Sequence, residues 1–402
     1  MSFHQALQTP NSTATDFDYL EIDKIYADSA CQTLRPRAVI EAVDEYYQEY
    51  NSCGDRVKYE WGQRVDQAVQ DTRDKILKLA GKSKREYVCV FTLNTTYGIN
   101  LILSQLPTGY YRQMVTSQIE HNSVFLPSIT YAKKLGLKRT VLSRQSDGSL
   151  IYNPTELERS IVLLNTTSNI DGVQLANAEH LAKRVHEKGG IIIIDGAQTM
   201  GYNPEFVRNI DFDALCFSGH KMYGPSLGVI IIKKNLLLQL DITFIGGGTV
   251  ESVSENKYKL LSSEPASMLE AGLQNYSGII GLGAAVSWKA KFYPEGHEPN
   301  HHLERLSTML YDAVKQTNSI TLLNQAPSPI LSFFSDRIDS HRLAIYLSAR
   351  GIMARSGYFC CHYFLDSVMH YPPLLRISLG LNNTVAEVER LDEALQLAVG
   401  GL

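Results

Sequence analysis

Residues 190–195 read GIIIID, four consecutive isoleucines closed by an aspartate. A strand with one solvated face alternates apolar and polar residues, whereas a strand covered on both faces is apolar throughout. Runs of the same β-rich kind occur at 87–92, 113–117, 138–143, 160–165, 214–218 and 228–233. Between them lie helical patterns at 97–105, 122–134, 175–188 and 276–291. This alternation predicts an α/β fold with a mostly parallel, seven-stranded sheet between layers of helices.

The character of the chain changes after about residue 295. Shorter strand patterns at 328–335 and 374–380 are separated by a helical pattern at 339–350, and a final helix starts near residue 384. This pattern is typical of a smaller α+β unit. We therefore predict a large domain over 24–285, a small C-terminal domain over 286–402, and an N-terminal segment, 1–23, that joins the small domain.

Composition excludes several classes of protein. The chain has 402 residues, 44% of them hydrophobic, and a net charge of −4 with acidic and basic residues intermixed. Such a charge balance argues against a nucleic-acid or membrane partner. The six cysteines lack the spacing of a zinc site or a disulfide framework. No secretory signal or membrane-length apolar run is visible, so we expect a cytoplasmic protein without a metal.

Polar residues follow several of the predicted strands. Asp195 ends one strand, Thr95 and Thr96 follow another, and His121 and Asn169 stand after two more. Each alone fits an ordinary role such as helix capping. However, the carboxyl ends of parallel strands form the ligand-binding edge of an open sheet. We therefore expect these side chains to meet.

The stretch DFDALCFSGHKMYGP, residues 211–225, adds a lysine to this edge. Lys221 comes just after an apolar strand, where an ammonium is costly unless it is paired, solvated or chemically used. Pyridoxal phosphate (PLP) needs a lysine for covalent attachment, an anion for its pyridine nitrogen, donors for its phosphate and a flat group over its ring. The predicted strand ends supply these groups in Lys221, Asp195, Thr95, Thr96, Ser218, His220 and His121.

Ten segments in chain order resemble motifs of the class V aminotransferase superfamily, and within it those of cysteine desulfurases and selenocysteine lyases. They are YADSA (26–30), TLNTTYGIN (92–100), EHNSV (120–124), SNIDG (168–172), IDGAQ (194–198), FSGHKMYGP (217–225), GGGT (246–249), LEAG (269–272), RSGYFC (355–360) and LRISLGLNNTVAEVERL (375–391). The resemblance implies the fold type I of PLP-dependent transferases, a homodimer and an amino-acid substrate.

The resemblance also implies roles for single residues. Lys221 matches the lysine that bonds to the cofactor, Asp195 the partner of the pyridine nitrogen, and Gln198 the partner of the ring hydroxyl. His121 matches the catalytic histidine stacked on the ring, and Asn169 a residue near ring and substrate. The phosphate contacts are matched by Thr96, Ser218 and His220, and Thr95 is added as a cofactor-binding residue because of its place beside Thr96 at the helix start. Arg376 matches the arginine that binds the substrate carboxylate, with Arg355 nearby in the predicted substrate site.

Cys360 bears on the specific reaction. In desulfurases an Arg-Thr-Gly-x-x-Cys segment presents the cysteine that takes sulfur from the substrate as a persulfide and leaves alanine. RSGYFC keeps Arg355, Gly357 and the cysteine at the same offset. A buried, inert cysteine is the alternative role for Cys360.

The neighbouring Cys361 lacks a counterpart in the family pattern, and both a vicinal disulfide with Cys360 and simple packing are open for it. The resemblance also implies a sulfur acceptor as a partner.

Three departures from the family pattern concern the substrate rather than the cofactor. Leu273 replaces a phosphate-binding hydroxyl, Tyr358-Phe359 replaces a His-His pair, and DRVKYEWG (55–62) keeps Arg56 of a substrate loop but not its histidine. The substrate could be cysteine or selenocysteine. Other class V activities remain open: a lyase for cysteine conjugates, an epimerase or an aminotransferase. A catalytically silent scaffold with this fold is the alternative that is not an enzyme.

Two further patterns in the sequence are explained by ordinary helix structure rather than by a binding site. GIIGLGAAV (278–286) lacks the preceding strand of a dinucleotide-binding loop, so we predict helix packing there. The histidine-rich EGHEPNHHLE (295–304) is predicted to be the solvated start of a helix.

Overall fold

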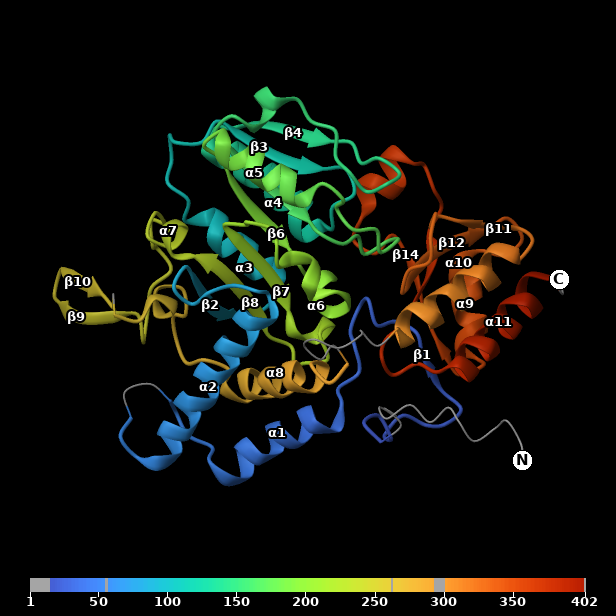
Figure 1. Ribbon diagram of the computed structural model, residues 1–402, viewed down its shortest axis with the longest axis horizontal. Coiled ribbons are helices and arrows are strands. Elements are labelled where there is room, and N and C mark those ends of the chain that lie inside the picture. The colour runs from blue at the N-terminus through green and yellow to red at the C-terminus, as the bar shows by residue number, and fades with distance from the viewer. Residues whose placement is uncertain (1–14, 55–56, 262, 293–300, 401–402) are drawn as a thin grey trace.

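The computed structural model describes residues 15–54, 57–261, 263–292 and 301–400. Its large sheet has the strand order β2-β8-β7-β6-β5-β3-β4 (Figure 1). Only β8 runs against its neighbours, β2 and β7, and the other pairs are parallel. The strands are β2 (Tyr87–Thr92), β3 (Gln113–Ser117), β4 (Lys138–Leu142), β5 (Ser160–Asn165), β6 (Ile191–Asp195), β7 (Ala214–Ser218) and β8 (Gly228–Lys233). The predicted α/β fold with a mostly parallel seven-stranded sheet is confirmed.

Both faces of this sheet are buried. In β6, Ile192 and Ile194 pack into a core with α2, α5 and α8, whereas Ile191 and Ile193 pack into a second core with α3 and α4. The four consecutive isoleucines are therefore divided between two cores. The helices are α1 (Arg37–Glu49), α2 (Glu60–Leu79), α3 (Thr95–Ser104), α4 (Asn122–Leu135), α5 (Ala178–Glu187), α6 (Thr199–Tyr202), α7 (Lys234–Leu237) and α8 (Tyr276–Lys289).

A smaller antiparallel sheet follows in the C-terminal part of the chain, with the order β11-β12-β15-β14. Helices pack around it in a separate core (orange to red in Figure 1). Its strands are β11 (Ile320–Leu322), β12 (Ile330–Ser335), β14 (Arg355–Gly357) and β15 (Leu374–Ser378), and its helices are α9 (His302–Gln316), α10 (Ser340–Ser348) and α11 (Val385–Gly400).

The N-terminal part of the chain reaches this smaller unit. Strand β1 (Ile25–Tyr26) pairs in parallel with β13 (Ile352–Met353), and Asp28 forms an isolated bridge with Ser378. Phe17 packs in the same core as the C-terminal helices. The boundaries at residues 23 and 285 remain predictions.

Short elements complete the fold. The β9 (Val250–Ser254) and β10 (Lys257–Leu260) hairpin extends away from the large sheet (Figure 1). Single turns of 3₁₀ helix occur at Pro154–Leu157, Pro204–Val207, Gly219–Lys221 and Pro265–Met268, and a π-helix at Tyr363–Val368. Within the described ranges, no helix has both the length and the apolar character needed to cross a membrane.

Most predicted elements agree with the structure at their centres and differ at their ends. The helix predicted from residue 175 begins at Ala178, and the preceding Leu175 N–H donates to the Thr166 carbonyl in the loop after β5. The glycine-rich run 278–286 is part of α8, as predicted. There a Cβ on Gly283 would lie 2.3 Å from Thr72 Oγ1 of α2, so glycine permits close packing of the two helices. The histidine-rich stretch 295–304 lies partly outside the described residues.

A charged cluster lies beside the large sheet, away from the strand ends singled out above. His186 of α5 contacts Asp213 at 2.8 Å through Nε2 and Asp211 at 3.3 Å through Nδ1, and Lys233 contacts both carboxylates. The hydrogen bond to Asp213 raises the pKa of His186 above its usual value, against opposing effects of burial and Lys233. Protonated His186 therefore stabilises the folded state.

This contribution should be present below pH ~6.5, the usual histidine pKa in an unfolded chain, and should disappear as pH rises through the folded-state pKa. We expect His186→Gln to lower the free energy of unfolding by about 1 kcal/mol at mildly acidic pH. The difference should shrink above neutral pH. Urea unfolding at mildly acidic to alkaline pH measures the free energy of unfolding of each variant. His180→Gln, at an exposed position on α5, is the control. A loss that grows with rising pH would contradict the assignment.

Candidate active site

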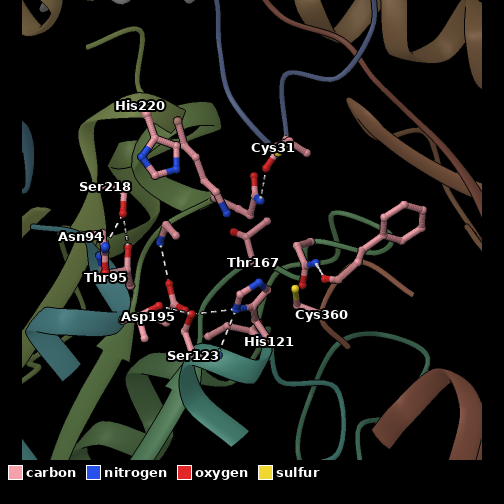
Figure 2. A pocket seen from close by; sticks show the side chains of 18 of the residues that line it. Cys31, Asn94, Thr95, His121, Ser123, Thr167, Asp195, Ser218, His220 and Cys360 are labelled. Atoms are coloured by element: carbon pink, nitrogen blue, oxygen red, sulfur yellow. Dashed lines mark hydrogen bonds between the residues drawn. The ribbon is translucent and has the colours of Figure 1, made fainter. Parts of the chain in front are cut away.

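The polar residues predicted at the strand ends surround one pocket of about 340 Å³. In Figure 2 the labelled side chains point inward from several strand and helix ends. All twelve residues that the sequence assigned to a site line it: Thr95, Thr96, His121, Asn169, Asp195, Gln198, Ser218, His220, Lys221, Arg355, Cys360 and Arg376. The contacts and charge of each side chain determine what it can bind.

One end of the pocket is formed by the N-terminus of α3. The Thr95 N–H donates to Ser218 Oγ at 2.9 Å, and the two hydroxyl oxygens lie 2.7 Å apart. Thr96 Oγ1 lies 2.6 Å from Ser123 Oγ. A Cβ on Gly228 would lie 2.4 Å from the Asn94 backbone nitrogen, so glycine allows β8 to approach this turn. Clustered hydroxyls at a helix N-terminus suit a phosphate.

Asp195 and Lys221 provide opposite charges in the middle of the pocket. Asp195 is buried at the end of β6, and its Oδ1 accepts the Ala197 N–H at 2.9 Å. Burial raises the pKa of Asp195, while the backbone hydrogen bond and Lys221 oppose this. Burial also lowers the pKa of Lys221, which increases the fraction of neutral amine able to act as a nucleophile. A carboxylate in such a site is stabilised by a cationic partner.

His121 precedes α4 and accepts the Ser123 N–H through Nδ1 at 3.0 Å. Because Nδ1 uses its lone pair in this bond, a neutral ring carries its proton on Nε2. Burial, with the nearby cations Lys221 and Arg376, lowers the pKa of His121 to about 3. The ring is therefore neutral near physiological pH and can pack as a flat group on an aromatic ligand.

The donor set of the pocket fits PLP. A lysine, a buried carboxylate, hydroxyls at a helix N-terminus and a neutral histidine are the groups that this cofactor needs. Gln198 donates from Nε2 to the Ala30 carbonyl at 2.8 Å, and its buried Oε1 has no hydrogen-bond partner among the described residues. A polar substituent of a ligand ring would satisfy such an atom.

The end of the pocket nearest the smaller sheet contains two arginines. Arg376 on β15 is buried, donates from Nη1 to the Asn169 carbonyl at 3.0 Å and contacts Asp28 at 3.3 Å. Arg355 on β14 is half exposed and donates from Nε to the other oxygen of Asp28 at 2.9 Å. Asp28 thus holds both guanidinium groups. Nη1 and Nη2 of Arg376 each keep a second N–H, which suits a carboxylate.

Cys360 lies in the loop between β14 and the π-helix, and its side chain is exposed at the pocket. Phe359 and Cys360 both have left-handed backbone conformations, with φ of 48° and 58°. The Cys360 carbonyl accepts the Asn122 N–H of α4 at 2.7 Å, and the Phe359 carbonyl accepts Asn169 Nδ2–H at 2.9 Å. These two bonds attach the loop to the large sheet and its helices.

Cys361 differs from its neighbour. Its thiol is buried in a small apolar cluster and is free, so packing accounts for it without a vicinal disulfide. Burial raises the pKa of this thiol, which disfavours the reactive thiolate.

Sequence reasoning gave no role to several residues of this site. Asp28 was quoted within YADSA, yet its link between Arg355 and Arg376 became visible only when distant segments were brought together. Cys31 and Thr167 line the pocket without having been singled out. Asn169, expected near the ring and substrate, lines the pocket, and its amide nitrogen donates to the Phe359 carbonyl in the Cys360 loop.

The structure describes only one of the two departures at Leu273 and Arg56. Leu273 is 78% exposed, so in the single chain it contributes to no pocket contact. Arg56 lies outside the described residues.

Comparisons with known proteins agree with this fold. The chain is 29% identical over 387 residues to a probable cysteine desulfurase of Vibrio cholerae, covering 93% of each chain. It is 30% identical to a probable cysteine desulfurase of Pyrococcus abyssi, covering 94% of this chain and 95% of the relative. The apo structure of a cysteine desulfurase from Thermococcus onnurineus superposes with a TM-score of 0.89 at 27% identity, covering 99% of this chain and all of that one.

The family model described as Aminotransferase class-V matches residues 25–391. This range begins at β1, includes every residue that lines the pocket and ends within α11. The chain belongs to the class-V aminotransferase family.

Proposed function

We propose that this enzyme removes sulfur from cysteine, or selenium from selenocysteine, through a persulfide on Cys360 and releases alanine. The observation that carries the proposal is the placement of an exposed thiol in the pocket that also contains Lys221 and Arg376. The relatives named as cysteine desulfurases support it, because they match nearly the whole chain.

The residues described above would hold PLP, the cofactor of this family. Lys221 would bond to it, Asp195 would face its pyridine nitrogen, and His121 would lie on its ring. The phosphate would be held by the α3 N-terminus together with Thr95, Thr96, Ser218 and His220. Gln198 would contact the ring hydroxyl. When bound, PLP supplies an electron sink for negative charge at the α-carbon of the substrate.

Three side chains of the protein have separate roles in the proposed reaction. Arg376 binds the substrate carboxylate, with Asp28 and the Asn169 carbonyl holding its guanidinium in place. Lys221 Nζ, when not bonded to the cofactor, would remove the α-proton, and burial lowers its pKa, which increases the fraction of neutral amine able to act as a base. Neutral His121 maintains the apolar face over the ring without adding charge.

Sulfur transfer requires the Cys360 thiolate. Its Sγ attacks the substrate sulfur, the bond between that sulfur and the β-carbon breaks, and a new S–S bond forms. The substrate takes up protons at its α- and β-carbons and leaves as alanine, so cysteine and a thiol become alanine and a persulfide. Lys221, protonated once it has taken the α-proton, provides a cation that interacts electrostatically with Cys360.

Partners and location follow from the family resemblance. We propose a homodimer, a thiol-containing sulfur acceptor that unloads Cys360 and a cytoplasmic location. We propose neither a nucleic-acid nor a membrane partner.

Products distinguish this activity from the alternatives. With cysteine and a thiol reductant, we expect alanine and sulfide in equal amounts, and with selenocysteine alanine and selenide. Purified holoenzyme is incubated with each amino acid, and alanine, pyruvate, ammonia and sulfide are measured separately. Pyruvate and ammonia as the main products would favour a lyase, and a keto acid formed with loss of the cofactor's aldehyde form would favour an aminotransferase. If the purified protein does not bind PLP, the remaining alternative is a catalytically silent scaffold with this fold.

A further inference from the structure

The aromatic ring of Phe359 lies against the guanidinium of Arg376. The Cζ atom of Arg376 is 4.6 Å from the centroid of the ring, and both side chains are buried. A cation over an aromatic face is attracted by the ring quadrupole, most strongly where water is excluded. The residue immediately before Cys360 is therefore bound to the arginine proposed to hold the substrate carboxylate.

A hydrogen-bonded path joins the same two residues. Arg376 Nη1–H donates to the Asn169 carbonyl at 3.0 Å, and Asn169 Nδ2–H donates to the Phe359 carbonyl at 2.9 Å. Arg376, Asn169 and Phe359 thus form a closed set of contacts. Arg376 is itself fixed by Asp28 on its other side.

The backbone of this loop depends on such support. Phe359 and Cys360 are two consecutive non-glycine residues with positive φ, a conformation that persists only where the surroundings hold it. The described hydrogen bonds that hold the two carbonyls come from Asn169 and Asn122. Contact between the Phe359 ring and Arg376 adds the side-chain anchor.

We propose that Phe359 is a positioning residue that sets the Cys360 thiol at a fixed place relative to the carboxylate-binding Arg376. This inference rests on the proposed function. In cysteine the sulfur is a fixed number of bonds from the carboxylate, so a fixed separation between Arg376 and the attacking thiol selects that sulfur. An aromatic side chain, in place of the histidine of the family pattern, performs this role without a proton-transfer group.

The test compares Phe359→Leu with Phe364→Leu. The two phenylalanines are each 9% exposed and belong to the same apolar cluster, but only Phe359 contacts Arg376. We expect Phe359→Leu to lower kcat for alanine formation about tenfold with KM changed less than about twofold, because Asp28 still holds Arg376. Phe359→Tyr, which keeps the ring, should restore kcat. Phe364→Leu should keep a rate close to that of the unchanged enzyme.

Hydrogen exchange provides a readout that needs no turnover. In the holoenzyme, peptides covering residues 355–362 should exchange faster in Phe359→Leu, and the Phe359→Tyr enzyme should match the unchanged one. Phe364→Leu should affect chiefly the π-helix at Tyr363–Val368. Equal exchange at 355–362 in Phe359→Leu and Phe364→Leu would overturn the proposal, as would a raised KM with unchanged kcat.

The two proposals fail in different ways. If the unchanged enzyme makes no alanine from cysteine, the proposed function is wrong, and the exchange comparison still decides whether Phe359 anchors the loop. If alanine is made and Phe359→Leu matches Phe364→Leu in both kcat and exchange, the function stands and the positioning role is wrong.

Discussion

Lys221→Ala is expected to abolish the covalent attachment of PLP and to lower the rate of alanine formation by at least about 10³-fold. Lys221 has two tasks in the proposed reaction, as the amine that binds the cofactor and as the base that removes the α-proton. Alanine has no group for either. Burial and the nearby Arg376 lower the pKa of Lys221, and a water molecule in the place of its amine would be a much weaker base.

Borohydride reduction followed by peptide mass spectrometry measures the attachment, because it fixes the cofactor on the lysine that holds it. The unchanged enzyme should carry the added mass on the peptide with Lys221, and Lys221→Ala should lack it. Lys289→Met is the control, since Lys289 is also buried but donates to the carbonyls of Met200 and Gly201. That variant should lose stability and keep the modified Lys221. Full turnover in Lys221→Ala would show that the lysine has been wrongly assigned.

Cys360→Ser is expected to reduce alanine formation from cysteine at least about 10³-fold and to leave the absorbance of the bound cofactor unchanged. A serine hydroxyl is a poor nucleophile toward sulfur and cannot store it as a persulfide. The cofactor should be unaffected, because none of the hydrogen bonds described for Cys360 involves Thr95, Thr96, Ser218 or His220. Mass spectrometry after brief treatment with cysteine should find one additional sulfur on the Cys360 peptide.

Cys361→Ser provides the matched comparison at the next position. Its thiol is buried in an apolar cluster, so the variant should lose some stability and retain most activity. A fully active Cys360→Ser enzyme that releases pyruvate would instead support the lyase, in which the sulfur leaves without a protein nucleophile.

The cofactor end of the pocket was predictable because its residues follow strands. Apolar runs predict buried parallel strands, and the carboxyl ends of such strands share one edge. Asp195, Ser218 and the turn at Thr95 could therefore be placed together before any contact was known. The prediction needed only the strand ends, and these were correct to within one residue.

The substrate end was less predictable, because its contacts depend on side-chain direction and on loops. Nothing in the local pattern of YADSA indicates that Asp28 holds two arginines from the far end of the chain. The sequence of the Cys360 loop showed that a histidine pair was missing. Only the structure shows that Phe359 packs on Arg376.

The pairing of β1 with β13 has a consequence for how the protein is made. Ile25 can pair with Ile352 only after the C-terminal part of the chain has been made. The same holds for the contacts of Asp28 with Arg355 and Arg376. Contacts so distant in sequence form late and slow the search for the native topology. On the ribosome, where N-terminal parts fold first, the turn at Thr95 and the 3₁₀ turn that ends at Lys221 can assemble while the C-terminal residues are still untranslated. The half of the pocket that we propose binds the substrate carboxylate exists only when translation is almost complete. A nascent or truncated chain could therefore form the proposed cofactor end without the proposed substrate end.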